Sequence, residues 1–347
     1  GILADLLGFR RIALLGGVVY GAGLWLASHS ETALGLYTNL GGVVGIGIGL
    51  SGMIVVMGAV GQVAPPERRS TAFGVITVAF SIGMFIMAPV LQYLINLYGW
   101  SEALQFSGGL VLIISLLSLG LPGHSPKIEK SSEPEAESEL TLLKTINGAM
   151  SHSGYLLLNV GFFVCGFHVA FIGTHLPSFL QSEGISISTA SWALAMIGLF
   201  NMFGSMIFGR MGDSLSKKNL LSLLYTLRAV VIAGFLAIPL NEITAIAFGA
   251  AIGFLWLATV PLTSGIVAQV FGTRYLSTLW AIVFFSHQLG AFLGVWLGGR
   301  VYDATGTYTP VWLASIALGL LAGIIHLPIR EQPWKPSTLE IKPSGGD

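Results

Sequence analysis

The chain has 347 residues, of which 54% are hydrophobic and only 9% are charged, with 16 basic and 16 acidic side chains. Ordinary soluble domains carry about 25% charged residues, so this composition excludes a water-soluble globule. Four segments, 32–66, 70–101, 184–209 and 243–273, contain no charged side chain. Each is longer than the roughly 20 apolar residues that cross a bilayer as a helix. The net charge of zero gives no reason to expect a nucleic-acid partner.

Continuous apolar runs predict ten membrane-spanning helices. They lie near residues 11–28, 36–61, 70–95, 103–121, 154–180, 190–209, 219–238, 244–270, 277–299 and 310–329. A membrane β-barrel is disfavoured, because its strands alternate lipid-facing and lumen-facing residues over about 10 positions. The predicted fold class is therefore an all-α membrane protein embedded in a lipid bilayer.

The basic residues predict which loops face the cytoplasm. Placing the first turn inside puts 14 of the 16 Lys and Arg residues on one face, while Arg300 falls on the other and Arg228 lies within a span. This asymmetry obeys the positive-inside rule. We expect a multi-pass protein of the plasma or inner membrane with a cytoplasmic C-terminus.

Composition divides the chain into two helical parts. The segment "PGHSPKIEKSSEPEAESEL" carries five glutamates, four serines and three prolines. Such a segment buries too little apolar area to offset the entropy of ordering, which predicts a solvated cytoplasmic linker. The expected organisation is a four-span N-terminal half (1–121), a linker (122–150), a six-span C-terminal half (151–330) and a cytoplasmic tail (331–347). A short amphipathic helix is expected at the end of the linker.

An internal repeat relates the two halves. An offset of 207 residues aligns Gly58 with Gly265, Gln62 with Gln269, Ser70 with Ser277, Thr71 with Thr278, and Gly83 with Gly290, and an offset of 208 aligns Asp5 with Asp213. Two spans precede the shared turn in the second half and none precede it in the first. The repeat thus predicts a twelve-helix protein whose first two helices lie upstream of Gly1.

The turn "GILADLLGFRR" has the form G-x-x-x-D-x-x-G-x-R-R, and a degenerate copy occurs at 209–218. Together with two helical halves and a long linker, this turn resembles the major facilitator superfamily of secondary transporters. The Tyr98-Gly99-Trp100 motif after the third span is similar to the monocarboxylate-porter branch. The resemblance implies transport by alternating access, no enzymatic activity, no cofactor and a monomeric protein.

Ionisable residues inside the spans are the first candidates for transport chemistry, because burying charge in a bilayer is costly. No Asp or Glu falls inside the ten predicted spans, whereas His168 and His287 lie near mid-membrane. Histidine titrates near neutral pH, so both are predicted to bind solute or proton. The alternative is that each imidazole only bonds a neighbouring helix.

Four further residues are candidates for the solute site. Arg228 could attract an anion, or its long side chain could instead extend to the membrane interface. Asn201, Trp256 and Gln288 lie at mid-depth and could orient a small solute by hydrogen bonds. Equally, polar side chains hold helices together in membranes. No catalytic residues and no metal ligands are predicted.

A second group of residues is predicted to form a cytoplasmic gate. Asp5 is expected to face the N-terminal end of the ninth span at Ser277, and Asp213 the third span at Ser70, since helix N-termini attract carboxylates. The basic residues of the two turns, Arg10, Arg11, Lys217 and Lys218, complete this group. A solvated turn that only sets topology is the alternative.

These observations predict a secondary transporter for a small organic anion such as a monocarboxylate, coupled to protons. A carrier of a different solute, acting as an exporter or exchanger, is the main alternative. A membrane sensor or an intramembrane enzyme is a minor one. Catalysis would need a nucleophile held by a base, and Cys165 with His168 is the only closely spaced pair of that kind.

Overall fold

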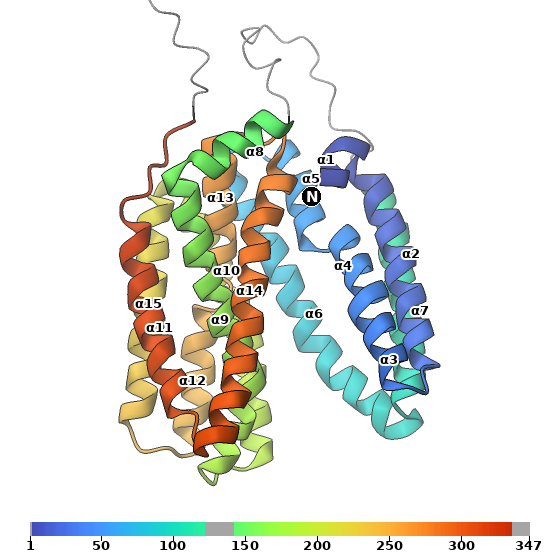
Figure 1. Ribbon diagram of the computed structural model, residues 1–347, viewed down its shortest axis with the longest axis vertical. Helices are drawn as coiled ribbons and strands as arrows, with labels where there is room; N and C mark the ends of the chain where they lie inside the picture. The colour runs from blue at the N-terminus through green and yellow to red at the C-terminus, as the bar shows by residue number, and fades with distance from the viewer. Residues whose placement is uncertain (1, 122–141, 335–347) are drawn as a thin grey trace, which may run out of the picture.

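The computed structural model describes residues 2–121 and 142–334, and these are helical almost throughout (Figure 1). The first part contains α1 (Ile2–Leu7), α2 (Phe9–Ser28), α3 (Ala33–Leu36), η1 (Tyr37–Val44), α4 (Gly45–Ser51), α5 (Met53–Val63), η2 (Pro66–Arg68), α6 (Arg69–Tyr98), α7 (Trp100–Leu117) and η3 (Ser118–Gly120). The second contains α8 (Leu142–Ser151), α9 (Ser153–Ser182), α10 (Ile187–Ser214), α11 (Lys217–Ala237), α12 (Glu242–Phe254), α13 (Thr259–Phe271), α14 (Leu276–Thr305) and α15 (Thr309–His326).

Ten helical segments within the described residues are long and apolar enough to cross a membrane. They coincide with the ten predicted spans, which confirms the all-α membrane fold class. Figure 1 shows two groups of helices, α1–α7 and α9–α15, with α6 running obliquely between them and α8 lying across one end. That end also carries Arg10, Arg11, Lys217 and Lys218, and it is called the basic end below. Residues 122–141 of the predicted linker and 335–347 of the predicted tail lie outside the described part of the chain.

Local signals in the sequence explain where several helices begin. Asn241 and Thr244 form a reciprocal capping box at the start of α12, and Ser186 caps α10 by accepting a hydrogen bond from the Thr189 amide. Such caps satisfy amide groups that have no partner within the helix. Gly99 joins α6 to α7 with φ of 98°, a conformation that favours glycine. The glycine of the Tyr-Gly-Trp motif is therefore required by the turn itself.

Glycines allow the closest helix contacts. A Cβ added to Gly166 of α9 would overlap the carbonyl oxygen of His287 on α14. On the seam between α6 and α10, a Cβ at Gly74 would lie 2.8 Å from the Ser205 carbonyl oxygen, and one at Gly209 would lie 2.9 Å from that of Ser70. Small residues let membrane helices approach at backbone distance. The α6–α10 seam joins the two halves in this way.

Two spans that the sequence predicts as continuous helices are interrupted. In the first half, Gly52 has an extended backbone between α4 and α5. In the second half, residues 255–258 separate α12 from α13. The repeat offset of 207 places Gly52 opposite Thr259, the first residue after the second interruption, so the two interruptions are neighbours in the repeat. Non-helical backbone within a membrane needs partners from the surrounding protein. The 255–258 segment is called the helix break below.

Candidate functional site

Asp213 joins the two halves at the basic end. It lies at the end of α10, and its carboxylate accepts hydrogen bonds from the amides of Ser70 (2.8 Å) and Thr71 (3.0 Å) and from the Thr71 hydroxyl. Both donors belong to the N-terminus of α6, in the other half. A carboxylate at this position satisfies free amides and complements the helix dipole. Asp213 therefore caps a helix of the opposite half.

Asp5 makes the matching contact on the other side. Its carboxylate, carried by α1, accepts hydrogen bonds from the Thr278 amide and the Thr278 hydroxyl at 2.6 Å each, at the N-terminus of α14. Burial raises the pKa of Asp5 from 3.8 to about 6, although the hydrogen bonds from Thr278 act in the opposite direction. Thr278 and Thr71 are repeat-related, so the two carboxylates occupy equivalent positions. The sequence predicts Asp213 at Ser70, whose amide it does bind, and does not single out the two threonines, which donate both an amide and a hydroxyl.

The four basic residues of the turns lie at the same end, but the hydrogen bonds found for them stay within one half. Arg10 donates to the Leu121 carbonyl (3.0 Å), and Arg11 is exposed. Lys217 donates to Gln269 (2.8 Å), while Lys218 donates its amide to Glu331 (2.7 Å) and its ammonium to the Leu327 carbonyl (2.8 Å). Lys218 thus fastens the segment after α15 to the start of α11, and Lys217 joins the start of α11 to α13. Lys217 lies close enough to Asp213 for their charges to interact, whereas among the described residues no hydrogen bond joins the four basic side chains to Asp5 or Asp213.

Arg228 supports the helix break from α11. It is only 1% exposed, and its guanidinium donates to the Leu255 carbonyl at 3.0 Å and 2.6 Å and to the Trp256 carbonyl. The remaining nitrogen lies 3.5 Å from the Cys165 sulfur, which in turn lies 3.3 Å from the Thr259 hydroxyl. The side chain thus points into the half rather than toward the membrane interface. Its hydrogen bonds replace those that the interrupted helix lacks.

Asn201 supports the same break from α10. Its side-chain oxygen accepts from the Leu257 amide (2.8 Å) and from the Ser205 hydroxyl (3.2 Å). Its side-chain nitrogen donates to the Ser81 hydroxyl on α6 at 2.6 Å. Polar groups from α6, α10 and α11 therefore meet around four residues of non-helical backbone.

The two histidines differ in surroundings. His168 is 1% exposed, and one ring nitrogen pairs with the Ser315 carbonyl of α15 (2.8 Å). His287 is 7% exposed; its Nδ1 pairs with the side chain of Gln288 (3.1 Å) and its ring stacks on Phe284. Among the described residues, His287 Nε2 has no hydrogen-bond partner. His168 Nδ1 is buried without a partner in the same way, so each histidine has one bonded and one unpaired ring nitrogen, and the bond of His168 to Ser315 ties α9 to α15.

The other two predicted solute-site residues, Trp256 and Gln288, also differ in burial. Trp256 is buried within the helix break, and its carbonyl is one of the two held by Arg228. Gln288 is exposed beside His287. Sequence reasoning missed Ser81, because a serine in an apolar span carries no signal until its partner is known. The thiol of Cys165, which the sequence places near His168, contacts Arg228 and Thr259.

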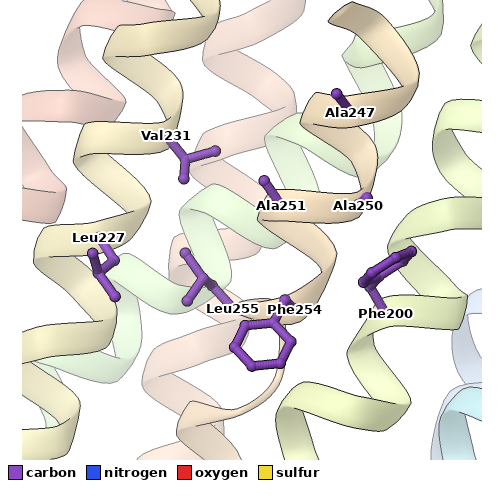
Figure 2. Close-up of a pocket in the computed structure, with 8 residues that line it drawn as sticks. All are labelled: Phe200, Leu227, Val231, Ala247, Ala250, Ala251, Phe254 and Leu255. Atoms are coloured by element: carbon purple, nitrogen blue, oxygen red, sulfur yellow. The ribbon is translucent and has the colours of Figure 1, made fainter. Parts of the chain in front are cut away.

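A groove on the surface of the second half does not resemble a site for a polar solute. Its volume is about 500 Å³, and its walls come from α10, α11 and α12. Figure 2 shows that every labelled side chain, including Phe200, Leu227 and Phe254, ends in carbon. An apolar lining offers no hydrogen bond to an anion. The polar residues described above are thus the better candidates for solute chemistry.

The fold consists of two helical bundles that are joined through capped helix ends, and each bundle contains an interrupted span. These features define an all-helical membrane transporter. A family model of the Major Facilitator Superfamily matches residues 1–262 and 158–343. The chain belongs to this superfamily, and it is a secondary transporter rather than an enzyme.

Curated relatives extend the similarity over nearly the whole chain. Mouse monocarboxylate transporter 12 is 26% identical over 362 residues, covering 94% of this chain and 73% of the relative. Rat monocarboxylate transporter 13 is 28% identical over 338 residues, covering 94% and 75%. The monocarboxylate-porter resemblance seen in the sequence is thus confirmed as distant homology.

Solved structures agree in fold. A variant of the E. coli fucose:proton symporter superposes with a TM-score of 0.68 at 15% identity, covering 94% of this chain and 85% of the symporter. A proton:xylose symporter superposes with a TM-score of 0.70 at 15% identity, covering 93% and 80%. At this identity the likeness concerns the fold alone.

Proposed function

We propose that this protein transports a monocarboxylate or a related small organic anion together with a proton. The observation that carries the proposal is the homology to monocarboxylate transporters over 94% of the chain. The charge inside the second half supports it, because Arg228 lies within a span while the acidic residues lie near the span ends. Such an interior favours an anion over a cation.

The geometry suggests how the predicted residues share the work. His287 is less buried than His168, with 7% of its surface exposed against 1%, and its Nδ1 pairs with Gln288, so this pair is the proposed contact for solute or proton. Arg228, Asn201 and Trp256 shape the helix break, and His168 joins α9 to α15. Their role in transport is to hold the site in place, and a positive potential from Arg228 adds long-range attraction for an anion.

Alternating access supplies the proposed cycle. The two halves, 1–121 and 151–330, rock against each other about the solute site. Asp5 and Asp213 hold the basic end closed, and their release opens it. In this proposal the protein lies in the cell membrane and its basic end faces the cytoplasm, since that end carries most of the Lys and Arg residues.

Uptake of labelled monocarboxylates into vesicles tests the proposal. The purified protein should concentrate lactate or pyruvate when the outside is acidic, and His287→Gln should remove the pH dependence of uptake. His168→Gln is the matched control, since it removes a buried imidazole whose bond to Ser315 is structural. It should lower stability and leave the pH profile unchanged. If the protein takes up neither acid at any proton gradient, its solute is not one of these monocarboxylates. An unchanged pH profile in His287→Gln would show that this residue takes no part in proton coupling.

A further inference from the structure

The contacts of Asn201 connect the two halves through the helix break. Asn201 on α10, Ser81 on α6 and Ser205 on α10 are all fully buried. Asn201 donates to Ser81 across the boundary between the halves and accepts from the Leu257 amide inside the second half. One side chain thus bonds to a helix of the first half and to the unwound backbone of the second.

Hydrogen-bond chemistry fixes the direction of this chain of contacts. The Leu257 amide can only donate, so the side-chain oxygen of Asn201 must face it, and the side-chain NH₂ must face Ser81. The Ser81 hydroxyl donates to the Thr77 carbonyl (2.8 Å) and therefore accepts from Asn201. Neither the amide of Asn201 nor the hydroxyl of Ser81 can turn over without losing a buried bond. Losing such a bond leaves an unsatisfied polar group at considerable cost.

The position of this contact on the α6–α10 seam makes it sensitive to movement. Toward the basic end the two backbones touch at Gly74 and Gly209. From there α6 runs obliquely toward α7 at the opposite end of the molecule (Figure 1). The Ser81–Asn201 bond lies farther along α6 than the glycine contacts. A rotation of α6 against α10 therefore changes the distance between Ser81 and Asn201 more than it changes the contacts at Gly74.

We propose that Asn201 is a positioning residue that couples the relative movement of the two halves to the shape of the helix break. When α6 lies against α10, Ser81 holds Asn201, and Asn201 holds the Leu257 amide. When α6 moves, Asn201 loses Ser81 and its hold on Leu257 weakens. Arg228 holds the Leu255 and Trp256 carbonyls from within the second half, so among the side-chain hydrogen bonds described for the break only that of Asn201 leads on to the first half. The proposal does not depend on which solute is carried.

Hydrogen–deuterium exchange of the 255–258 backbone tests this coupling in the full chain reconstituted in lipid. Ser81→Ala removes the link between the halves and leaves Asn201 and Leu257 in place. Exchange at the break should become about three- to tenfold faster, the factor that corresponds to one buried hydrogen bond. Ser81→Thr keeps the hydroxyl and should restore the wild-type rate.

Thr77→Ala is the matched control. Thr77 lies one turn away on α6, is equally buried, and bonds only the Phe73 carbonyl of its own helix. In Thr77→Ala, the backbone amides of residues 255–258 should exchange at the wild-type rate. The proposal is wrong if Thr77→Ala accelerates exchange as much as Ser81→Ala does, because general loosening of α6 would then be the cause. It is equally wrong if Asn201→Ala accelerates exchange while Ser81→Ala stays within twofold of the wild type, since Asn201 would then only cap the break.

A reciprocal measurement separates coupling from local support. Leu276 on α14 is fully buried against Gly61 of α5, so a Leu276→Cys reporter is labelled only when the basic end opens. Arg228→Lys loosens the break from its other side. Because coupling between two sites acts in both directions, this change should alter labelling of the reporter about threefold when Ser81 is present. In the Ser81→Ala background it should leave labelling unchanged. Equal changes in both backgrounds would overturn the proposal.

Discussion

Closure of the basic end should depend on pH through Asp5. The carboxyl group has a pKa of about 6 in the closed arrangement, raised from 3.8 by burial. When the halves separate and water reaches the group, its pKa returns toward the ordinary value. Closing therefore takes up a proton. The stabilisation of the closed form by protonation of Asp5 is fully present below pH 3.8 and is lost as the pH rises through about 6.

The size of the effect follows from the two pKa values. Between pH 7 and pH 5 the ratio of closed to open molecules should rise about tenfold. Asp5→Asn keeps an oxygen that can accept from the Thr278 amide and hydroxyl but cannot titrate. The tenfold change should disappear in this variant.

Maleimide labelling of the Leu276→Cys reporter measures the open fraction. The native Cys165 is buried and does not compete for the reagent. Thiol chemistry itself varies with pH, so the rate in the Asp5 protein is divided by the rate in Asp5→Asn at the same pH. This quotient should fall about tenfold from pH 7 to pH 5. A quotient that stays constant within twofold would refute the assignment of a titrating, closure-linked carboxyl to Asp5.

Three further outcomes are expected. Arg228→Met leaves the Leu255 and Trp256 carbonyls unpaired in the helix break and should lower stability by about 1–3 kcal/mol, measured by thermal unfolding in detergent; an unchanged melting temperature would contradict the bracing role. Thr71→Val removes one donor to Asp213 and should open the basic end by about 1 kcal/mol, seen as severalfold faster labelling of the reporter; slower labelling would be the wrong sign. Gly166→Ala forces a Cβ into the His287 carbonyl and should abolish folding or cost several kcal/mol. Gly173→Ala on the same helix should be tolerated, because its Cβ would meet only Trp256 at 4.0 Å. Equal expression of the two variants would show that α9 and α14 pack less closely.

Much of the fold could be predicted because it depends on local composition. Each span is an uninterrupted apolar run, and the glycine in Tyr98-Gly99-Trp100 lies at the turn between two of them. The two aspartates could be placed at helix N-termini because the repeat aligns Ser70 with Ser277 and Asp5 with Asp213. Both signals are carried by short stretches of sequence.

The helix break could not be predicted, because the residues that hold it are distant in sequence. The stretch Leu255–Trp256–Leu257–Ala258 is as apolar as any helix interior. Its partners, Arg228 and Asn201, precede it by 27 and 56 residues. One signal was present in the repeat, since the offset of 207 places Gly21 opposite Arg228. A cation that appears in only one half indicates a partner in that half alone, and here the partner is backbone.

Arg228 also constrains how the second half is made. An arginine at the centre of a single membrane helix costs about 2.5–3.5 kcal/mol on insertion. The carbonyl groups that bond it in the finished protein, those of Leu255 and Trp256, belong to the next span and are synthesised later. Inserted alone, α11 would expose its guanidinium to lipid, so α11 and α12 enter the bilayer most favourably as a helical hairpin. The residue that braces the mature transporter thus favours joint insertion of α11 and α12.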